Sequence, residues 1–171
     1  MTAAAARTCG GCTLCCTVMG IAELAKPAGA GCPHCVSGSH CSIYGGRPGS
    51  CQSFRCQWLA NPTLPASLRP DRSGVVLTVS GEPERLWLIA NCEAADPLAW
   101  RRAPIYPWLK QQARLTWGSG AAVLANALNR FWLIAPEEDR DLGEIADGAA
   151  IEVEVRNTGS FIVRHSPTSG Q

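Results

Sequence analysis

Nine of the ten cysteines in this 171-residue chain lie between Cys9 and Cys56, and only Cys92 lies outside that stretch. Nine glycines are interspersed among them and leave little room for long helices or strands. Such a segment loses much conformational entropy on folding and has few apolar side chains to bury. Metal–thiolate bonds supply the missing stabilisation in small domains that are unfolded without metal. Residues 1–60 are therefore predicted to form a small, irregular, metal-stabilised cysteine-rich domain.

The redox compartment decides whether clustered cysteines form disulfides or bind metal. Residues 1–7 are alanine-rich but hold no apolar stretch long enough for a secretory signal. No apolar run approaches the roughly 20 residues that a membrane span needs. We therefore expect a cytoplasmic protein without a membrane contact, whose thiols meet a reducing environment and bind metal. The even number of cysteines would also suit disulfides, but the missing signal and the cysteine spacing argue against them.

The leading motif is Cys9-x2-Cys12-x2-Cys15-Cys16. A two-residue spacing lets both thiolates of a pair point at one ion while the intervening backbone amides donate to the sulfurs. Three cysteines in such a series resemble the opening of the bacterial ferredoxin run, which continues with x3-Cys-Pro. Met19 occupies the position of that next cysteine here. The fourth ligand must therefore come from a more distant part of the chain.

The adjacent cysteines Cys15 and Cys16 are predicted to bind with two different sets of ligands. The two side chains diverge in an extended chain, and closing both onto one ion requires an awkward tight ring. One of them is expected to join Cys9 and Cys12, and the other to face remote ligands. The candidates for these remote ligands are Cys32, Cys41, Cys51 and Cys56. Two four-thiolate centres, or one centre and a second, partly filled site, would satisfy this arrangement.

The cysteines between residues 8 and 60 also carry a family resemblance. The run Cys9-Gly-Gly-Cys12-Thr-Leu-Cys15-Cys16 and the later segment 41–56 resemble the YkgJ-type cysteine-cluster family, described as a zinc- or iron-chelating domain of bacterial cytosolic proteins. The matching cysteines are Cys9, Cys12, Cys15, Cys16, Cys32, Cys41, Cys51 and Cys56, with Tyr44, Arg47 and Pro48 in the linking motif. A related cluster occurs in flagellin lysine methylases, where it is associated with an iron–sulfur centre. The rest of this chain does not resemble that enzyme, so the methylase activity is not expected.

Other residues near the cluster have competing interpretations. Cys35 is an extra ligand, a redox thiol or a bystander, and the sequence does not separate these roles. Cys92 follows an apolar strand and is expected to be a small core residue. His34 and His40 could replace a thiolate, but solvent-facing loop positions are expected for both. Arg47 could donate to a sulfur, although a role in bracing its own loop is favoured.

The remainder of the chain has a different composition. Residues 61–73 contain three prolines and are interpreted as a linker, residues 74–165 as an α+β domain, and residues 166–171 as a flexible tail. The domain is expected to hold a mostly antiparallel sheet with one or two helices. The expected strands are 75–79 and 85–90, 121–128 and 131–135, and 151–155 and 161–164, with a helix at 104–116. Segment 121–128 could also be a helix.

Charge and motifs exclude several functions. The formal net charge of +1 gives no basis for a nucleic-acid surface. The chain has no G-x-x-x-x-G-K, H-E-x-x-H or G-x-S-x-G motif, and whether it is an enzyme is left open. We expect a metal-binding protein that holds zinc or an iron–sulfur cluster, with a structural, metal-handling or redox role. The alternatives are a redox enzyme or maturation factor whose α+β domain recognises a substrate, and a zinc-stabilised module that binds an unidentified protein partner or a nucleic acid.

Overall fold

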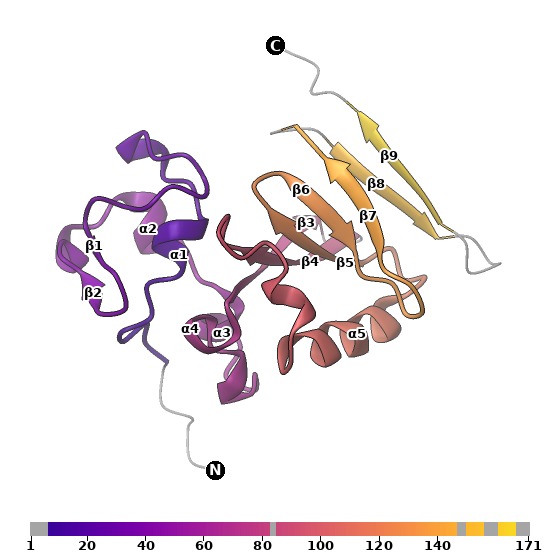
Figure 1. The fold of residues 1–171 in the computed structure, drawn as a ribbon, viewed down its shortest axis with the longest axis horizontal. Coiled ribbons are helices and arrows are strands. Elements are labelled where there is room, and N and C mark those ends of the chain that lie inside the picture. The colour runs from indigo at the N-terminus through magenta and orange to yellow at the C-terminus, as the bar shows by residue number, and fades with distance from the viewer. Residues whose placement is uncertain (1–6, 83–84, 147–149, 156–160, 167–171) are drawn as a thin grey trace.

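The computed structural model describes residues 7–82, 85–146, 150–155 and 161–166 (Figure 1). The cysteine-rich segment forms one side of the molecule, and a five-stranded sheet with a long helix forms the other. The mixed helix and sheet content confirms the predicted α+β class. Among the described residues, no helix is both long enough and apolar enough to cross a membrane.

The cysteine-rich part is built from short elements, as its glycine content predicts. Its helices are α1 (Cys15–Val18), η1 (Ala22–Leu24), η2 (Tyr44–Gly46), α2 (Gly49–Ser53) and α3 (Gln57–Ala60). Its two strands, β1 (Cys35–Val36) and β2 (His40–Cys41), form a small antiparallel ribbon. None of these helices exceeds five residues, so the rest of this part is turns and loops.

The segment expected as a linker, residues 61–73, is folded onto the core. It contains η3 (Ala66–Leu68) and α4 (Pro70–Ser73). Leu64 and Leu68 are buried in the main hydrophobic cluster of the α+β part. This segment therefore contributes to the core as well as connecting the two parts of the chain.

The sheet follows the order β3-β4-β5-β6-β7. Its strands are β3 (Val75–Glu82), β4 (Arg85–Cys92), β5 (Ala122–Ala127), β6 (Arg130–Leu133) and β7 (Arg140–Glu144). Neighbouring strands are antiparallel except β4 and β5, which are parallel. A parallel pair needs a crossover connection, and here η4 (Ala99–Arg101) and α5 (Ile105–Thr116) provide it.

The helix α5 covers one face of the sheet. Ile105, Leu109 and Ala113, which are spaced four residues apart, are fully or almost fully buried against it. Leu115 of the same helix is instead 71% exposed. It lies two positions beyond Ala113, where the helix surface has turned away from the sheet.

The three predicted strand pairs of the α+β part are present, and the turn between β5 and β6 is shifted by one residue. The turn between β5 and β6 is formed by Leu128 and Asn129, which both have positive φ, rather than by Asn129 and Arg130. Segment 121–128 is thus a strand, and its helical alternative is wrong. The strands β8 (Ala150–Val155) and β9 (Phe161–Ser166) form a separate antiparallel pair. The turn expected between them and the tail beyond Ser166 lie outside the described residues.

The ends of the cysteine-rich part are held together by one side chain. The Arg7 guanidinium donates to the backbone carbonyls of Trp58 at 3.1 Å, Asn61 at 3.0 Å, Pro62 at 2.7 Å and Leu64 at 2.7 Å. The guanidinium carbon of Arg7 also lies 3.6 Å from the centre of the Trp58 ring, within the range of a cation–π contact. Residue 7 is therefore fixed beside the segment where the cysteine-rich part ends.

Apolar side chains and one glycine join the cysteine-rich part to the sheet. Val18 and Cys56 share a buried apolar cluster with Val76 of β3. Gly29, which has a φ of +79°, lies against Leu128 in the β5–β6 turn, and a Cβ at this position would stand 2.2 Å from a Leu128 methyl carbon. The sheet thus supports the cysteine-rich part at both places.

Candidate metal centre

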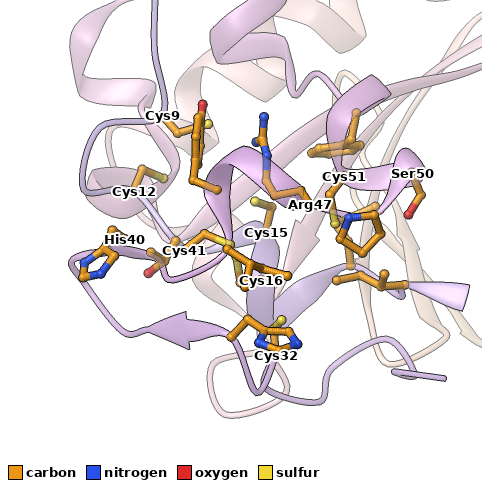
Figure 2. A pocket seen from close by; sticks show the side chains of 18 of the residues that line it. Cys9, Cys12, Cys15, Cys16, Cys32, His40, Cys41, Arg47, Ser50 and Cys51 are labelled. Carbon is orange, nitrogen blue, oxygen red and sulfur yellow. The ribbon is translucent and has the colours of Figure 1, made fainter. Parts of the chain in front are cut away.

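A cavity of about 570 Å³ lies in the cysteine-rich part, with the predicted ligands around it (Figure 2). Seven of the eight predicted ligands line it: Cys9, Cys12, Cys15, Cys16, Cys32, Cys41 and Cys51. They belong to two stretches of chain, residues 8–24 and 32–54, which the fold brings face to face. The eighth, Cys56, is not part of the lining and is buried in the cluster with Val18 and Val76.

The first two cysteines are positioned by a tight turn. The Cys12 amide donates to the Cys9 carbonyl at 3.0 Å, which places the two residues at the ends of one turn. The Cys12 sulfur accepts hydrogen bonds from the backbone amides of Leu14 and Asp71. Burial raises the pKa of the Cys12 thiol, and these two hydrogen bonds act in the opposite direction. Amide donors of this kind accompany thiolates that bind metal.

Cys56 has a similar setting on a different element. It is the N-cap residue of α3 and makes no side-chain hydrogen bond to the helix, but the nearby amides of Leu59 and Trp58 in its first turn act to lower the pKa of the thiol. Burial raises the pKa of Cys56, and nearby charges on Cys12 and Cys9 raise it further. Cys9, Cys12 and Cys56 therefore lie near one another although 47 residues separate the first from the last.

Cys15 and Cys16 occupy the first turn of α1. Their side chains share a hydrogen bond, and this bond, with burial, raises the pKa of Cys16. Cys16 has a second hydrogen bond, with the Cys35 side chain, and this bond acts to lower the pKa of Cys16. Cys15 instead packs at the edge of the apolar cluster that contains Cys56. The two sulfurs thus lie together while their other neighbours differ.

A second group of thiols gathers around Cys16. The Cys32 amide donates to the Cys16 carbonyl at 3.0 Å, which fixes the backbone of the two residues side by side. Burial raises the pKa of Cys51, and the charges of Cys16 and Cys32 contribute to this rise. Cys41, from β2, lines the same cavity. This group is distinct from the one formed by Cys9, Cys12 and Cys56.

A buried lysine lies beside this second group. The Lys26 side chain belongs to a residue that is 7% exposed, and its Nζ donates to the carbonyls of Thr17, Met19 and Pro27. Burial lowers the pKa of Lys26, whereas negative charge on Cys32, Cys16, Cys15 and Cys51 would raise it. The two carbonyls of Thr17 and Met19 come from the end of α1, where a cation is favourable.

Arg47 contributes a cation to the cavity wall itself (Figure 2). Its guanidinium carbon lies 3.8 Å from the centre of the Tyr44 ring, and its backbone carbonyl accepts a hydrogen bond from Gln52. These contacts agree with the predicted bracing role. Its Nε is nevertheless buried without a hydrogen-bond partner among the described residues, so the guanidinium retains an unused donor beside the cavity.

Neither cation has a carboxylate partner. The ion pairs among the described residues involve neither Lys26 nor Arg47. Glu23, the one acidic residue in the first sixty, accepts hydrogen bonds from the amide and hydroxyl of Ser50 at 2.8 and 2.7 Å. The thiols, when they ionise, therefore supply most of the negative charge near these two cations among the described residues, with Glu23 close to Cys51.

The structure also shows where the other residues considered near the cluster lie. Both His34 and His40 line the cavity; His40 is exposed, as expected for a loop histidine, whereas His34 is half-buried. Cys92 is 4% exposed within the main core cluster, which agrees with its predicted core role. Lys26 was not recognised from the sequence, because a lone lysine in a loop carries no pattern that distinguishes it.

The thiols stand around the cavity without meeting at one point. Within the described part of the chain, no three His, Cys, Asp or Glu side chains are grouped as a metal site. Ligation therefore requires sulfurs to move, and rotation about χ1 moves each sulfur without moving the backbone. The donor set itself suits zinc or an iron–sulfur cluster, since both are bound by cysteine thiolates.

Comparison with protein-family models, curated proteins and solved structures finds no match to this chain.

Proposed function

We propose that this protein binds zinc or an iron–sulfur cluster through the thiolates of its cysteine-rich part. The observation that carries the proposal is the cavity itself, because seven cysteines from two stretches of chain line one space. All ten cysteines are free thiols, so none is consumed in a disulfide. The similarity of the cysteine pattern to the YkgJ-type family supports the same proposal from the sequence.

The charges around the cavity support an anionic occupant. Four thiolates around Zn²⁺ or a [4Fe–4S]²⁺ cluster leave about −2 on the centre. Lys26 and Arg47 bring two positive charges close to it without carboxylate partners. A buried cation needs a compensating charge, and a metal–thiolate centre would provide one for each of these side chains.

The size of the cavity favours more than a single small ion. Its volume of about 570 Å³ is many times the roughly 30 Å³ that a water molecule occupies in the liquid. We therefore propose either a multi-atom cluster or two centres, one drawing on Cys9, Cys12 and Cys56 and the other on the thiols around Cys16. The role is structural, metal-handling or redox, and the location that we propose is the cytoplasm, where free thiols persist.

Elemental analysis of anaerobically purified protein tests the proposal. Zinc, iron and acid-labile sulfide are measured per chain, together with the absorption spectrum. A brown protein with absorption near 400 nm, iron and sulfide identifies a cluster, whereas a colourless protein with zinc identifies zinc centres. Wild-type protein is compared with Cys12→Ser and with Cys92→Ser, in which a core thiol outside the cavity is changed.

We expect Cys12→Ser to lose metal and Cys92→Ser to keep it. Folding of each variant is checked by circular dichroism, so that loss of metal is not confused with loss of structure. Protein that remains folded but contains neither zinc nor iron, even after anaerobic reconstitution with either metal and sulfide, would overturn the proposed function.

A further inference from the structure

Cys35 lies outside the family pattern and outside the cavity lining, yet the structure gives it the surroundings of a ligand. With Cys32 it forms a two-residue-spaced pair, and the Cys35 amide donates to the Cys32 carbonyl at 3.0 Å. The pair Cys9 and Cys12 has the same turn, closed by the same amide-to-carbonyl bond at 3.0 Å. Such a turn directs both sulfurs of a pair toward one ion.

The β1–β2 ribbon adds a third thiol to this turn. Cys35 is paired directly with Cys41, and Val36 with His40. Residues directly opposite each other project from the same face of an antiparallel pair, with Cβ atoms about 4.5–5.5 Å apart. The face with Cys35 and Cys41 is half-buried, whereas Val36 and His40 are both exposed. The two cysteines therefore share the inward face of the ribbon.

A fourth thiol reaches the same place from α1. The Cys16 side chain is hydrogen-bonded to that of Cys35, and the Cys16 carbonyl accepts the Cys32 amide at 3.0 Å. The ribbon is further held to the loop before α1, since the Gly38 amide donates to the Thr13 hydroxyl at 3.0 Å. Cys16 is thus in contact with both members of the Cys32–Cys35 turn.

We infer that Cys35 is a metal ligand and that it binds the second centre together with Cys16, Cys32 and Cys41. This inference rests on the proposed function, because it assigns ligands to a centre that the function requires. The ligands of the second centre would then be held by the Cys32–Cys35 turn, the strand pair β1–β2 and the helix α1. It leaves Cys9, Cys12, Cys15 and Cys56 for the first centre, and Cys51 as a neighbouring thiol outside both sets.

Metal-dependent protection of thiols tests this assignment in the wild-type protein. The anaerobically purified protein is treated with iodoacetamide, and modification of each cysteine is followed by peptide mass spectrometry. The same measurement is made after removal of the metal with a chelator. We expect Cys16, Cys32, Cys35 and Cys41 to be protected while metal is bound and to be alkylated at least ten-fold faster without it. Cys92 serves as the control, because burial protects it whether or not metal is present.

Substitution gives a second, independent readout. Cys35→Ser should lose the same centre as Cys16→Ser, and the double variant should lose no more metal than either single one. The matched control is Val36→Thr, which alters the next residue of β1 on its exposed face and should keep the full metal content. The first centre should remain in all of these proteins.

The two proposals fail in different ways. If no cysteine shows metal-dependent protection, the proposed function fails. If the other cysteines are protected by metal while Cys35 is alkylated at equal rates with and without it, the function stands and the assignment of Cys35 is overturned. This second result does not depend on a variant, so it holds even if Cys35→Ser does not fold.

Discussion

Backbone amides already surround two of the proposed ligand sulfurs. The amides of Leu14 and Asp71 act to lower the pKa of Cys12, and those of Leu59 and Trp58 act to lower the pKa of Cys56, although both pKa values remain raised by burial. Hydrogen bonds to a thiolate favour its charged form. A metal ion that displaces the proton from either sulfur therefore meets an anion whose hydrogen-bond partners are in place, with little reorganisation of the surrounding chain.

The neighbours of Cys15 and Cys16 lead to a prediction about metal content. Cys15 packs with the cluster around Cys56, whereas Cys16 is hydrogen-bonded to Cys35. Cys15→Ser should therefore lose the same metal as Cys12→Ser, and Cys16→Ser the same metal as Cys32→Ser. Elemental analysis and absorption spectra of the four variants check this. Loss of one and the same metal from both Cys15→Ser and Cys16→Ser would contradict it.

Cys92 makes the stability of the protein depend on pH in alkali. Burial raises the pKa of this thiol from 9.0 to about 11, so the folded protein retains a proton that the unfolded chain releases. Its contribution to stability is present below pH 9.0 and is lost as the pH rises to about 11. A shift of this size corresponds to about 3 kcal/mol of unfolding free energy.

The measurement is denaturant unfolding of wild-type protein and Cys92→Ala at pH 8 and pH 11. The variant lacks the thiol, so its unfolding free energy should fall by about 2 kcal/mol less than that of the wild type over this interval. Other groups titrate equally in both proteins and cancel. Equal losses in the two proteins would show that Cys92 does not retain its proton.

At the scale of elements, the sequence predicted those with strong hydrophobic periodicity. The strands β3 and β4 and the helix α5 lie where alternation and helical spacing placed them. The strand β7 was missed, because Arg140–Glu144 is mostly polar and shows no alternation of buried residues. The two-residue strands β1 and β2 were missed because a pair of residues has no period.

Leu109 tests how far α5 acts on the metal site. This side chain is fully buried in the main cluster, which includes none of the nine clustered cysteines. Leu109→Ala should lower the unfolding free energy by about 2–5 kcal/mol through lost burial and a cavity, without changing metal content in the folded fraction. Leu115→Ala on the same helix is the control, since Leu115 is 71% exposed. Loss of metal from folded Leu109→Ala protein would show that the α+β part contributes directly to the site.

Gly29 tests the contact between the cysteine-rich part and the β5–β6 turn. Its φ of +79° is unfavourable for any residue with a Cβ, and that Cβ would collide with Leu128. Gly29→Ala should lower the unfolding free energy by about 1–2 kcal/mol. Gly31→Ala is the matched control, because no atom lies within 4 Å of a Cβ there. Equal stability of the two variants in thermal unfolding would exclude a structural role for this contact.

At the scale of the whole molecule, the sequence predicted the members of the site but not their arrangement. The cysteine spacing, together with the resemblance to the YkgJ-type family, singled out eight cysteines, and seven of them share a cavity. The partition of these cysteines depends on how segments far apart in sequence meet, and spacing within one segment does not contain that information. The same limit applies to Lys26 and Cys35, whose importance comes from neighbours supplied by α1 and β2.

Removal of metal should affect the two parts of the molecule unequally. The main core is formed by residues from Leu64 to Ile134, and among the described residues of the cysteine-rich part only Trp58 packs against it. We therefore expect a chelator to abolish protection from hydrogen exchange for amides of residues 9–56, while α5 and β3–β5 stay protected. Hydrogen exchange followed by mass spectrometry measures this by segment. Simultaneous loss of protection in α5 would show that the whole molecule unfolds as one unit.

The Arg7 contacts with residues 58–64 have a consequence for protein engineering. They place the entry and the exit of the cysteine-rich part next to each other. Inserted domains are accommodated in surface loops of a host protein because their two ends are adjacent. The two ends of residues 7–64 could thus join an exposed host loop at nearly the same point, provided that the host covers Leu64, Val18 and Cys56, which the α+β part buries here.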